Sequence, residues 1–384
     1  MTEYVLNDIA EITSSKRIFY SDYVDSGIPF YRSREIINLD NGEDLKELIF
    51  ISQEKYHDIK NKFGAPSKND ILITSVGTIG NTYLVREEDE FYFKDGNLTW
   101  LRKWIDNVEP KFVLYWIKSP LGQGELYSQL IGSSQKALTI SALKKIKINI
   151  PPLPTQRKIA SILSAYDDLI ENNLKRIKLL EEKAFVTYKL LDKIEKHNLS
   201  ELYDTSSGGT PSRTNAEYFT GEINWFKSKE LADSILLESE EKITDSAIDK
   251  SSAKLFPTGS VIMAMYGATI GKLGLLSMPS STNQACCGII EKDKIKSNYF
   301  ILNWLLENRE YVLSFRMGAA QENISQQVIK NLLVSVPNDT DLRLFNSEMK
   351  PIYQLIKNIH QQNTRLREAR DILLPRLMNG QIEV

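Results

Sequence analysis

Two glycine-rich segments are the first candidates for chemistry in this sequence. They are "ITSVGTIGNTYLV" (residues 73–85) and "MAMYGATIGKLGLL" (residues 263–276), each with paired glycines near apolar runs. Such a loop can cradle phosphate, but a nucleotide-binding P-loop needs four residues between its first glycine and the Gly-Lys pair, followed by Ser or Thr. "GATIGKL" has three residues there and then Leu273. We therefore expect each segment to form a tight turn between two strands.

Other catalytic and metal-binding signatures are missing from the sequence. "NIPPL" (residues 149–153) approaches the Asn-Pro-Pro-aromatic signature of amino-methyltransferases, but Ile150 intrudes and Leu153 is not aromatic. There is no nucleophile elbow, HExxH motif or glycine-rich dinucleotide turn. The two cysteines, Cys286 and Cys287, are adjacent, a spacing that suits small buried hydrophobes better than a disulfide or zinc site. We expect a chain without catalytic residues or a metal.

Several basic and polar side chains are candidates for contacting DNA. Arg32 and Arg34 share one face of an expected strand, as do Lys227 and Lys229, so each pair can reach phosphate or a guanine edge. A solvated basic edge is the alternative. The other candidates lie in or beside the glycine segments, or just before two short helices capped by Thr139 and Ser325: Thr78, Thr269, Lys272, Ser134, Gln135, Gln321 and Asn323. The aromatic residues Phe30, Tyr31, Trp225 and Phe226 could stack on an extruded base, but we expect them in the core.

Composition limits the class of protein. The chain has 384 residues, 42% of them hydrophobic and 26% charged, which is typical of folded domains and is too long for one ordinary core. A net charge of −2 disfavours a protein that coats nucleic acid non-specifically, although a local basic face remains possible. We find no apolar stretch long enough to span a membrane and no secretory signal, so we expect a cytoplasmic protein.

The second half of the sequence repeats the first. "SGIPFYRSREI" (residues 26–36) matches "TGEINWFKSKEL" (residues 220–231), and "GTIG" matches "ATIG". Farther along, "FVLYWIKS" matches "FILNWLLE", and "SQKALTISALKKIKINIP" matches "AQENISQQVIKNLLVSVP". The chain therefore contains two copies of one unit, rather than a solenoid of many short repeats.

A long amphipathic segment follows each copy. Apolar residues recur there at alternating intervals of four and three, a mean of 3.5 that is typical of a coiled-coil seam. A helix lying on a globular core, the alternative, would have a wider apolar stripe. The seam positions are Ile159, Leu163, Tyr166, Ile170, Ile177 and Leu180 in the first helix, and Phe345, Met349, Ile352, Ile356, Ile359 and Leu366 in the second. Polar residues interrupt the seam at Asn173, Thr187, Asn363 and Arg370 and should fix its register.

These patterns predict an α+β fold with a tandem repeat. We expect globular domains at residues 1–151 and 199–337, and long helices at residues 152–198 and 338–384. If the helices pack antiparallel as a coiled coil, the two domains lie at opposite ends of a rod and are related by a pseudo-twofold axis.

The order of elements and four motifs resemble one known family. The motifs are the segment "GGTPSRTNAEYFTGEINWFKSKEL" (residues 208–231), the paired glycine loops, "IPPLPTQRKIASIL" (residues 150–163) and the terminal "LLPRLMNGQIEV" (residues 373–384). Together with the repeat they span nearly the whole chain. The sequence is therefore identified as similar to the DNA-specificity subunits of type I restriction-modification systems, called HsdS.

The resemblance implies a division of labour. Each globular domain would be a target recognition domain for one half of a bipartite site in double-stranded DNA, and the helices would set the spacer and dock two methyltransferase subunits. Restriction subunits would join through the complex, and S-adenosylmethionine and ATP with magnesium would bind to the partner chains. The competing hypothesis is a coiled-coil scaffold that joins two protein-binding modules without touching DNA; a single-chain enzyme with an unrecognised site is a third.

Overall fold

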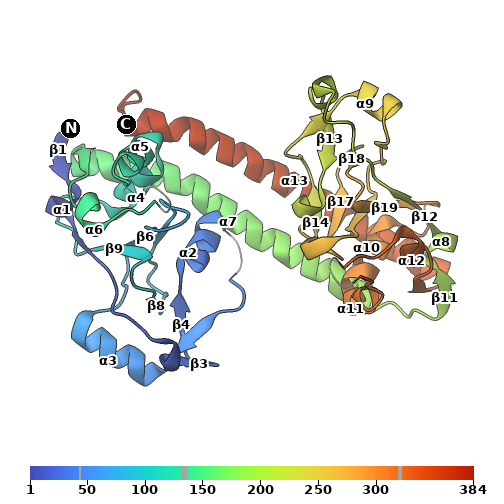
Figure 1. The fold of residues 1–384 in the computed structure, drawn as a ribbon, viewed down its shortest axis with the longest axis horizontal. Coiled ribbons are helices and arrows are strands. Elements are labelled where there is room, and N and C mark those ends of the chain that lie inside the picture. The colour runs from blue at the N-terminus through green and yellow to red at the C-terminus, as the bar shows by residue number, and fades with distance from the viewer. Residues whose placement is uncertain (43–44, 131–135, 294, 319–321) are drawn as a thin grey trace. The chain divides into compact units, whose positions relative to one another are not determined.

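The computed structural model describes residues 1–42, 45–130, 136–293, 295–318 and 322–384 (Figure 1). The chain forms two compact units, each of which combines helices with sheets. Unit 1 consists of Met1–Glu171 and Arg365–Val384, and unit 2 consists of Asn172–Thr364. The α+β class expected from the sequence is confirmed.

The described residues of unit 1 form three sheets. The strand orders are β1-β10, β2-β9-β6-β7 and β3-β5-β4-β8. The strands are β1 (Thr2–Val5), β2 (Glu11–Thr13), β3 (Tyr23–Val24), β4 (Ile28–Tyr31), β5 (Ile49–Ile51), β6 (Ile71–Thr74), β7 (Thr82–Leu84), β8 (Tyr92–Phe93), β9 (Leu98–Arg102) and β10 (Lys147–Ile150). The helices are α1 (Leu6–Ile9), η1 (Tyr20–Asp22), α2 (Ser33–Asn41), α3 (Gln53–Phe63), α4 (Pro110–Lys118), α5 (Pro120–Ser128) and α6 (Ile140–Leu143).

In the part of unit 2 that the structure describes there are also three sheets, with strand orders β11-β20, β12-β19-β16-β17-β14 and β15-β13-β18. The strands are β11 (Glu195–Asn198), β12 (Tyr203–Ser207), β13 (Ile223–Phe226), β14 (Ser234–Leu236), β15 (Lys242–Ile243), β16 (Val261–Ala264), β17 (Leu273–Leu276), β18 (Ser281–Thr282), β19 (Cys286–Glu291) and β20 (Leu333–Val336). The helices are α8 (Leu199–Leu202), η2 (Ala216–Phe219), η3 (Ser228–Glu230), α9 (Asp245–Lys250), η4 (Gly267–Thr269), α10 (Asn298–Glu307), α11 (Arg309–Leu313) and α12 (Gln326–Lys330).

The two units share a core of strand pairings, which confirms the tandem repeat, although among the described residues the main sheet has four strands in unit 1 and five in unit 2. Each begins with a strand that pairs antiparallel with its last strand, β1 with β10 and β11 with β20. Each has a parallel pair in its smaller sheet, β4 with β8 and β13 with β18. In each, a fully buried apolar strand, β6 or β16, lies between two antiparallel neighbours in the main sheet. Sequence matches of a few residues therefore reflect duplication of a complete domain.

Two long helices, α7 (Leu153–Lys189) and α13 (Asp339–Met378), pack together antiparallel. In unit 1, Asp167 pairs with Arg370 at 2.6 Å, while the earlier Leu163 shares a buried cluster with the later Leu377. In unit 2, Asn173 bonds to Asn363, while the ring of Tyr188 lies 6.4 Å from that of Phe345. In both units, residues later in α7 meet residues earlier in α13. Most of the expected seam residues are buried, and Tyr166, Leu180 and Leu366 are half-buried.

The end of α7 departs from the expected pattern. The 3.5-residue period predicted a helix to residue 198, but α7 ends at Lys189, because Glu195–Asn198 forms β11 and pairs with β20. The seam also shifts by one residue: Tyr188 is fully buried, whereas Thr187 bonds back to the carbonyl of Lys183. The aromatic contacts of Tyr188 with Phe300 and Phe345 explain the shift. The expectation that Thr187 lies in the seam was wrong.

Two of the polar residues expected in the seam, Asn173 and Asn363, contact each other in unit 2. Asn173 and Asn363 are at most 1% exposed, and Asn173 Nδ2 donates to Asn363 Oδ1 at 2.9 Å and to Gln362 Oε1 at 3.1 Å. An apolar partner at this level would leave an amide unsatisfied, so the pairing favours one register of the two helices.

Candidate nucleic-acid interface

Each glycine segment forms the turn of a β-hairpin, as its sequence predicted. In unit 1 the turn joins β6 to β7, and Gly80 N donates to Thr74 O at 3.0 Å. In unit 2 it joins β16 to β17, and Gly271 N donates to Ala264 O at 2.9 Å. The glycines have positive φ in both turns: 82° at Gly77, 93° at Gly80, 68° at Gly267 and 78° at Gly271. Glycine is required there because other residues are strained in this conformation.

A second loop lies against each glycine turn. Leu138 N donates to Ser75 O in unit 1, and Ile324 N donates to Met265 O in unit 2, both at 2.9 Å. These loops lead directly into α6 and α12, whose expected caps are confirmed: Thr139 accepts from Ala142 N, and Ser325 accepts from Val328 N. Two segments far apart in the sequence thus form one surface in each unit.

The surface formed by each glycine turn and its second loop contains only some of the residues predicted to contact DNA. Asn323 forms a bridge with Tyr266, the residue before the unit 2 turn, and therefore lies beside the segment that contains Thr269. Thr78 is exposed on the unit 1 turn. Three candidates, Ser134, Gln135 and Gln321, fall outside the described residues.

An open hollow of about 360 Å³ lies beside the unit 1 turn. It brings together Arg34 and Thr78, two candidates from different parts of the sequence. The full lining consists of Ser33, Arg34, Ile37, Asn38, Val76, Gly77, Thr78 and Asn97. Five of these side chains carry polar groups that can form hydrogen bonds with a ligand seated there, namely Ser33, Arg34, Asn38, Thr78 and Asn97.

The strand expected to carry Arg32 and Arg34 ends before them. Strand β4 stops at Tyr31, Arg32 is the N-cap of α2, and Arg34 lies in the helix. The reason is Glu35, which accepts from Arg32 N at 2.7 Å and so caps the helix. The same carboxylate accepts from Arg32 Nη2 at 2.8 Å and from Arg34 Nε at 3.1 Å. Burial alone would raise the pKa of the Glu35 carboxyl, but the bonds from Arg32 hold that pKa below its usual value.

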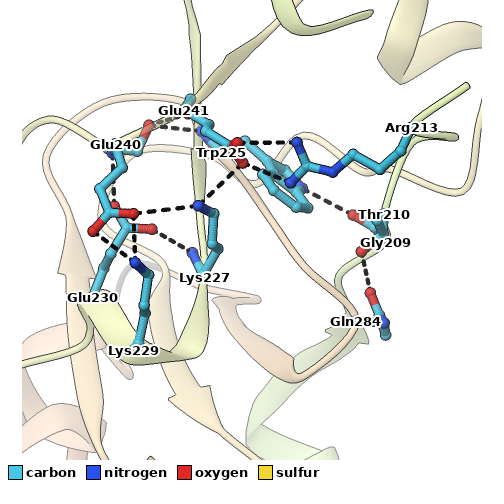
Figure 2. Close-up of polar contacts among 11 residues, drawn as sticks. Gly209, Thr210, Arg213, Trp225, Lys227, Lys229, Glu230, Glu240, Glu241 and Gln284 are labelled. Atoms are coloured by element: carbon cyan, nitrogen blue, oxygen red, sulfur yellow. Dashed lines mark hydrogen bonds and ion pairs between the residues drawn. The ribbon is translucent and has the colours of Figure 1, made fainter. Parts of the chain in front are cut away.

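Unit 2 repeats this cap with other residues. Lys227 is the N-cap of η3, so the expected strand face shared with Lys229 was also wrong. Glu230 accepts from Lys227 N at 2.8 Å, three residues on, as Glu35 does in unit 1. Figure 2 shows how the lysine side chains turn towards two further carboxylates. Lys227 Nζ lies 3.1 Å from Glu241, and Lys229 Nζ lies 2.7 Å from Glu240.

Arg213 completes this network of charges. Its guanidinium donates to both oxygens of Glu241, at 3.0 and 2.7 Å, beside Trp225 (Figure 2). It lies over the rings of Phe219 and Trp225. The bond from Arg213, helped by Lys227, lowers the pKa of Glu241 to about 2. The predicted cations of unit 2 are therefore paired with carboxylates in the free chain, and DNA phosphates would have to replace those partners.

Lys272 has an intramolecular partner as well. Its Nζ lies 2.9 Å from Asp233, so this lysine is not an isolated charge on the turn. Sequence reasoning missed the carboxylates that pair with the basic candidates. The spacing of Glu35 from Arg32, and of Glu230 from Lys227, fits a capping box and could have identified two of them; Asp233, Glu240 and Glu241 carry no such local signal.

The predicted aromatic residues pack in the core. Phe30, Trp225 and Phe226 are at most 2% exposed, and Tyr31 stacks on Phe91 with ring centroids 4.4 Å apart. Three of the four rings are thus buried, and Phe91 stacks on the ring of the half-buried Tyr31. Their expected role in packing is confirmed.

The residues that the structure describes also bear on metal, thiol and membrane sites. Among those residues, no cluster of three or more His, Cys, Asp or Glu side chains could hold a metal ion. Cys286 and Cys287 are buried and free, and burial raises the pKa of each thiol to about 12. No helix in the described residues has both the length and the apolarity needed to cross a membrane.

Comparison with known proteins identifies the repeated unit. The model of the type I restriction modification DNA specificity domain matches residues 1–182 and again residues 192–368. The MjaIX specificity subunit of a type I restriction enzyme from Methanocaldococcus jannaschii is 24% identical and aligns with 99% of this chain and 93% of its own length. A putative type I specificity subunit from Haemophilus influenzae is 33% identical over 48% of this chain and 44% of its own length.

A solved structure has the same fold. The S subunit of a type I restriction-modification system from M. genitalium superposes with a TM-score of 0.58 at 15% identity. The superposition covers 98% of this chain and 96% of that subunit.

Proposed function

This chain belongs to the type I restriction modification DNA specificity family, and from that premise we propose that it selects the target sequence for a type I restriction-modification complex. Each unit reads one half of a bipartite site in duplex DNA. The observation that carries the proposal is the presence of two matches to the specificity domain, each with a glycine turn joined by a backbone hydrogen bond to a second loop. Two equivalent surfaces suit two separate half-sites.

The surface around each turn supplies the contacts in this proposal. Thr78 in unit 1, with Thr269 and Asn323 in unit 2, reach base edges or phosphates from the turns and the loops beside them. Arg34 extends this surface in unit 1 and Lys229 in unit 2. Because both basic side chains are already paired with carboxylates, DNA binding involves exchange of ion-pair partners and not simple attraction to free charge.

The chemistry belongs to partner chains in this proposal. Two methyltransferase subunits dock on the helices α7 and α13, and methylation of adenine uses S-adenosylmethionine bound to those subunits. Restriction subunits use ATP and magnesium for translocation and cleavage. The isolated chain should therefore transfer no methyl group, whereas the reconstituted complex should.

Sequencing of the methylome with and without the gene tests the main proposal. Loss of the gene should remove methylation from one bipartite adenine motif and leave other motifs unchanged. In reconstituted form, the affinity for that motif should fall by about 0.9 log unit per phosphate contact for each log unit of salt. Indifferent methylation of random duplexes, or failure of the chain to co-purify with a methyltransferase, would refute the assignment.

The spacer is the second testable part of the proposal. We propose that α7 and α13 set the distance between the half-sites. Insertion of seven residues in each helix, after Glu171 and after Thr364, preserves the phase of the seam. It adds about 10 Å of helix, or about three base pairs. The half-site sequences should remain, while the preferred spacer lengthens; a four-residue insertion in each helix, which breaks the phase, is the control.

A further inference from the structure

A carboxylate holds the exit of the glycine turn in unit 2. Leu273 N, at the start of β17, donates to Asp233 Oδ1 at 3.0 Å, and Asp233 N donates back to Leu273 O at 2.8 Å. The preceding residue, Lys272, donates to Asp233 Oδ2 at 2.9 Å. Asp233 has φ of +62°, a conformation that Asp tolerates better than most residues. The backbone there is held in a strained form that aims the carboxylate at the turn.

The same carboxylate is tied to a neighbouring helix. Arg309, the first residue of α11, donates from Nη1 at 3.0 Å and from Nη2 at 2.6 Å, so it holds both oxygens of Asp233. These side chains are only 25% and 22% exposed. Burial would raise the pKa of Asp233, but the bonds from Arg309 and Lys272 outweigh it and hold that pKa below its usual value. A bidentate pair of this kind fixes geometry as well as charge.

Unit 1 reaches the same arrangement from different elements. Asp40, near the end of α2, accepts from Thr82 N and from Asn81 Nδ2, both at 3.2 Å. Lys118, the last residue of α4, lies 2.6 Å from the other carboxylate oxygen. Asn81 and Thr82 are the counterparts of Lys272 and Leu273, because each pair directly follows the second glycine of its turn. Two carboxylates therefore hold the same two positions of the duplicated turn, each backed by a cation from a helix.

We infer that Asp40 and Asp233 are positioning residues for DNA recognition, and the inference rests on the function proposed above. Each turn already has the backbone bonds of its hairpin, and the carboxylate adds a rigid link from the turn to a helix cation. This link orients the exposed face of the turn towards one half-site. It also neutralises the cation nearest the turn, which favours readout by hydrogen bonds and shape over non-specific attraction to phosphate.

The test compares the two halves of the site within one complex. Asp233→Asn and Asp40→Asn chains are assembled with the methyltransferase, and methylation rates are measured on the target duplex and on duplexes altered in one half-site only. Asp233→Asn should reduce discrimination against changes in one half by about tenfold, roughly the effect of one mismatched base pair. Asp40→Asn should do the same for the opposite half only. Each variant retains normal discrimination at the half read by its intact unit.

The salt dependence provides an independent readout. Asp233→Asn leaves Lys272 and Arg309 without their shared anion, so the slope of log affinity against log salt should steepen by up to about 1.8, or 0.9 for each new phosphate contact. Asp40→Asn releases only Lys118 and should steepen it by about 0.9 at most. A variant that merely destabilised its unit would lower the rate on every duplex by one factor and would not steepen the slope.

Three further variants complete the design. Lys272→Gln and Arg309→Gln each remove one cationic partner of Asp233 and should weaken discrimination at the same half as Asp233→Asn, even if that variant folds poorly. Asp204→Asn is the matched control, because Asp204 is 67% exposed and its pair with Lys292 is 3.5 Å long. The inference fails if the unmodified complex discriminates at both half-sites but each variant weakens discrimination equally at both, or at neither. That result would leave the proposed function intact. An unmodified complex that discriminates neither half would refute the proposed function and, with it, the inference.

Discussion

Glu181 should destabilise unit 2 at neutral pH, and replacement by glutamine should reverse the effect. The side chain lies on α7 and is largely buried, with the charge of Asp233 nearby; Tyr353 is a further neighbour. Burial, reinforced by Asp233, raises the pKa of the Glu181 carboxyl to about 7 from an ordinary 4.5. The folded chain therefore prefers the protonated form, whereas the unfolded chain ionises freely.

The sign and size of the effect follow from this difference. Because the pKa is higher in the folded state, the stability that protonated Glu181 contributes is complete below pH 4.5 and is lost as the pH rises to about 7. The loss proceeds at about 1.4 kcal/mol per pH unit and totals at most about 3 kcal/mol. Glu181→Gln removes the ionisation. The free energy of unfolding of the variant should equal that of the parent chain at pH 4.5. The difference in favour of the variant should grow up to about pH 7 and stay constant above it.

Urea unfolding at several pH values between 4.5 and 8.5 measures this difference. Hydrogen exchange of peptides from residues 172–364 assigns the transition to unit 2. Glu182→Gln is the matched control, since Glu182 is the next residue on α7 and is exposed. An advantage of Glu181→Gln that did not change with pH, or a loss of stability at pH 8, would refute the reasoning.

Three further outcomes are expected. Asn173→Leu should cost unit 2 about 1–3 kcal/mol by leaving Asn363 without its donor, and Asn363→Leu in the same chain should restore most of it; a double-mutant cycle in urea detects the coupling. Glu240→Gln should steepen the salt dependence of duplex binding by about 0.9 if Lys229 contacts phosphate, and an unchanged slope in fluorescence anisotropy would exclude that contact. Gly77→Ala should destabilise unit 1 by about 1–2 kcal/mol through its φ of 82°, with no steric clash; an unchanged unfolding midpoint would contradict this.

Local and periodic features of the sequence were sufficient to predict the architecture. The duplicated motifs implied two copies of one unit, and both copies pair their first strand with their last and place a buried strand between antiparallel neighbours. The 3.5-residue period implied the helix seam, because any side chain in that seam must be apolar or paired. The glycine spacing implied the two turns, because a positive φ is costly for other residues. Each of these signals arises within a few turns of helix or a single hairpin.

Only the tertiary structure decided which charges remain available. Arg32 and Lys227 were expected on strands, but a glutamate three residues later makes each an N-cap. Asp233 and Arg309 are 76 residues apart in the sequence and form a bidentate pair. Lys272, a candidate DNA contact beside its turn, shares that carboxylate. The sequence gives the type of each side chain. The partner that neutralises or orients it depends on contacts between distant segments, and those contacts form only when the sheets and helices pack.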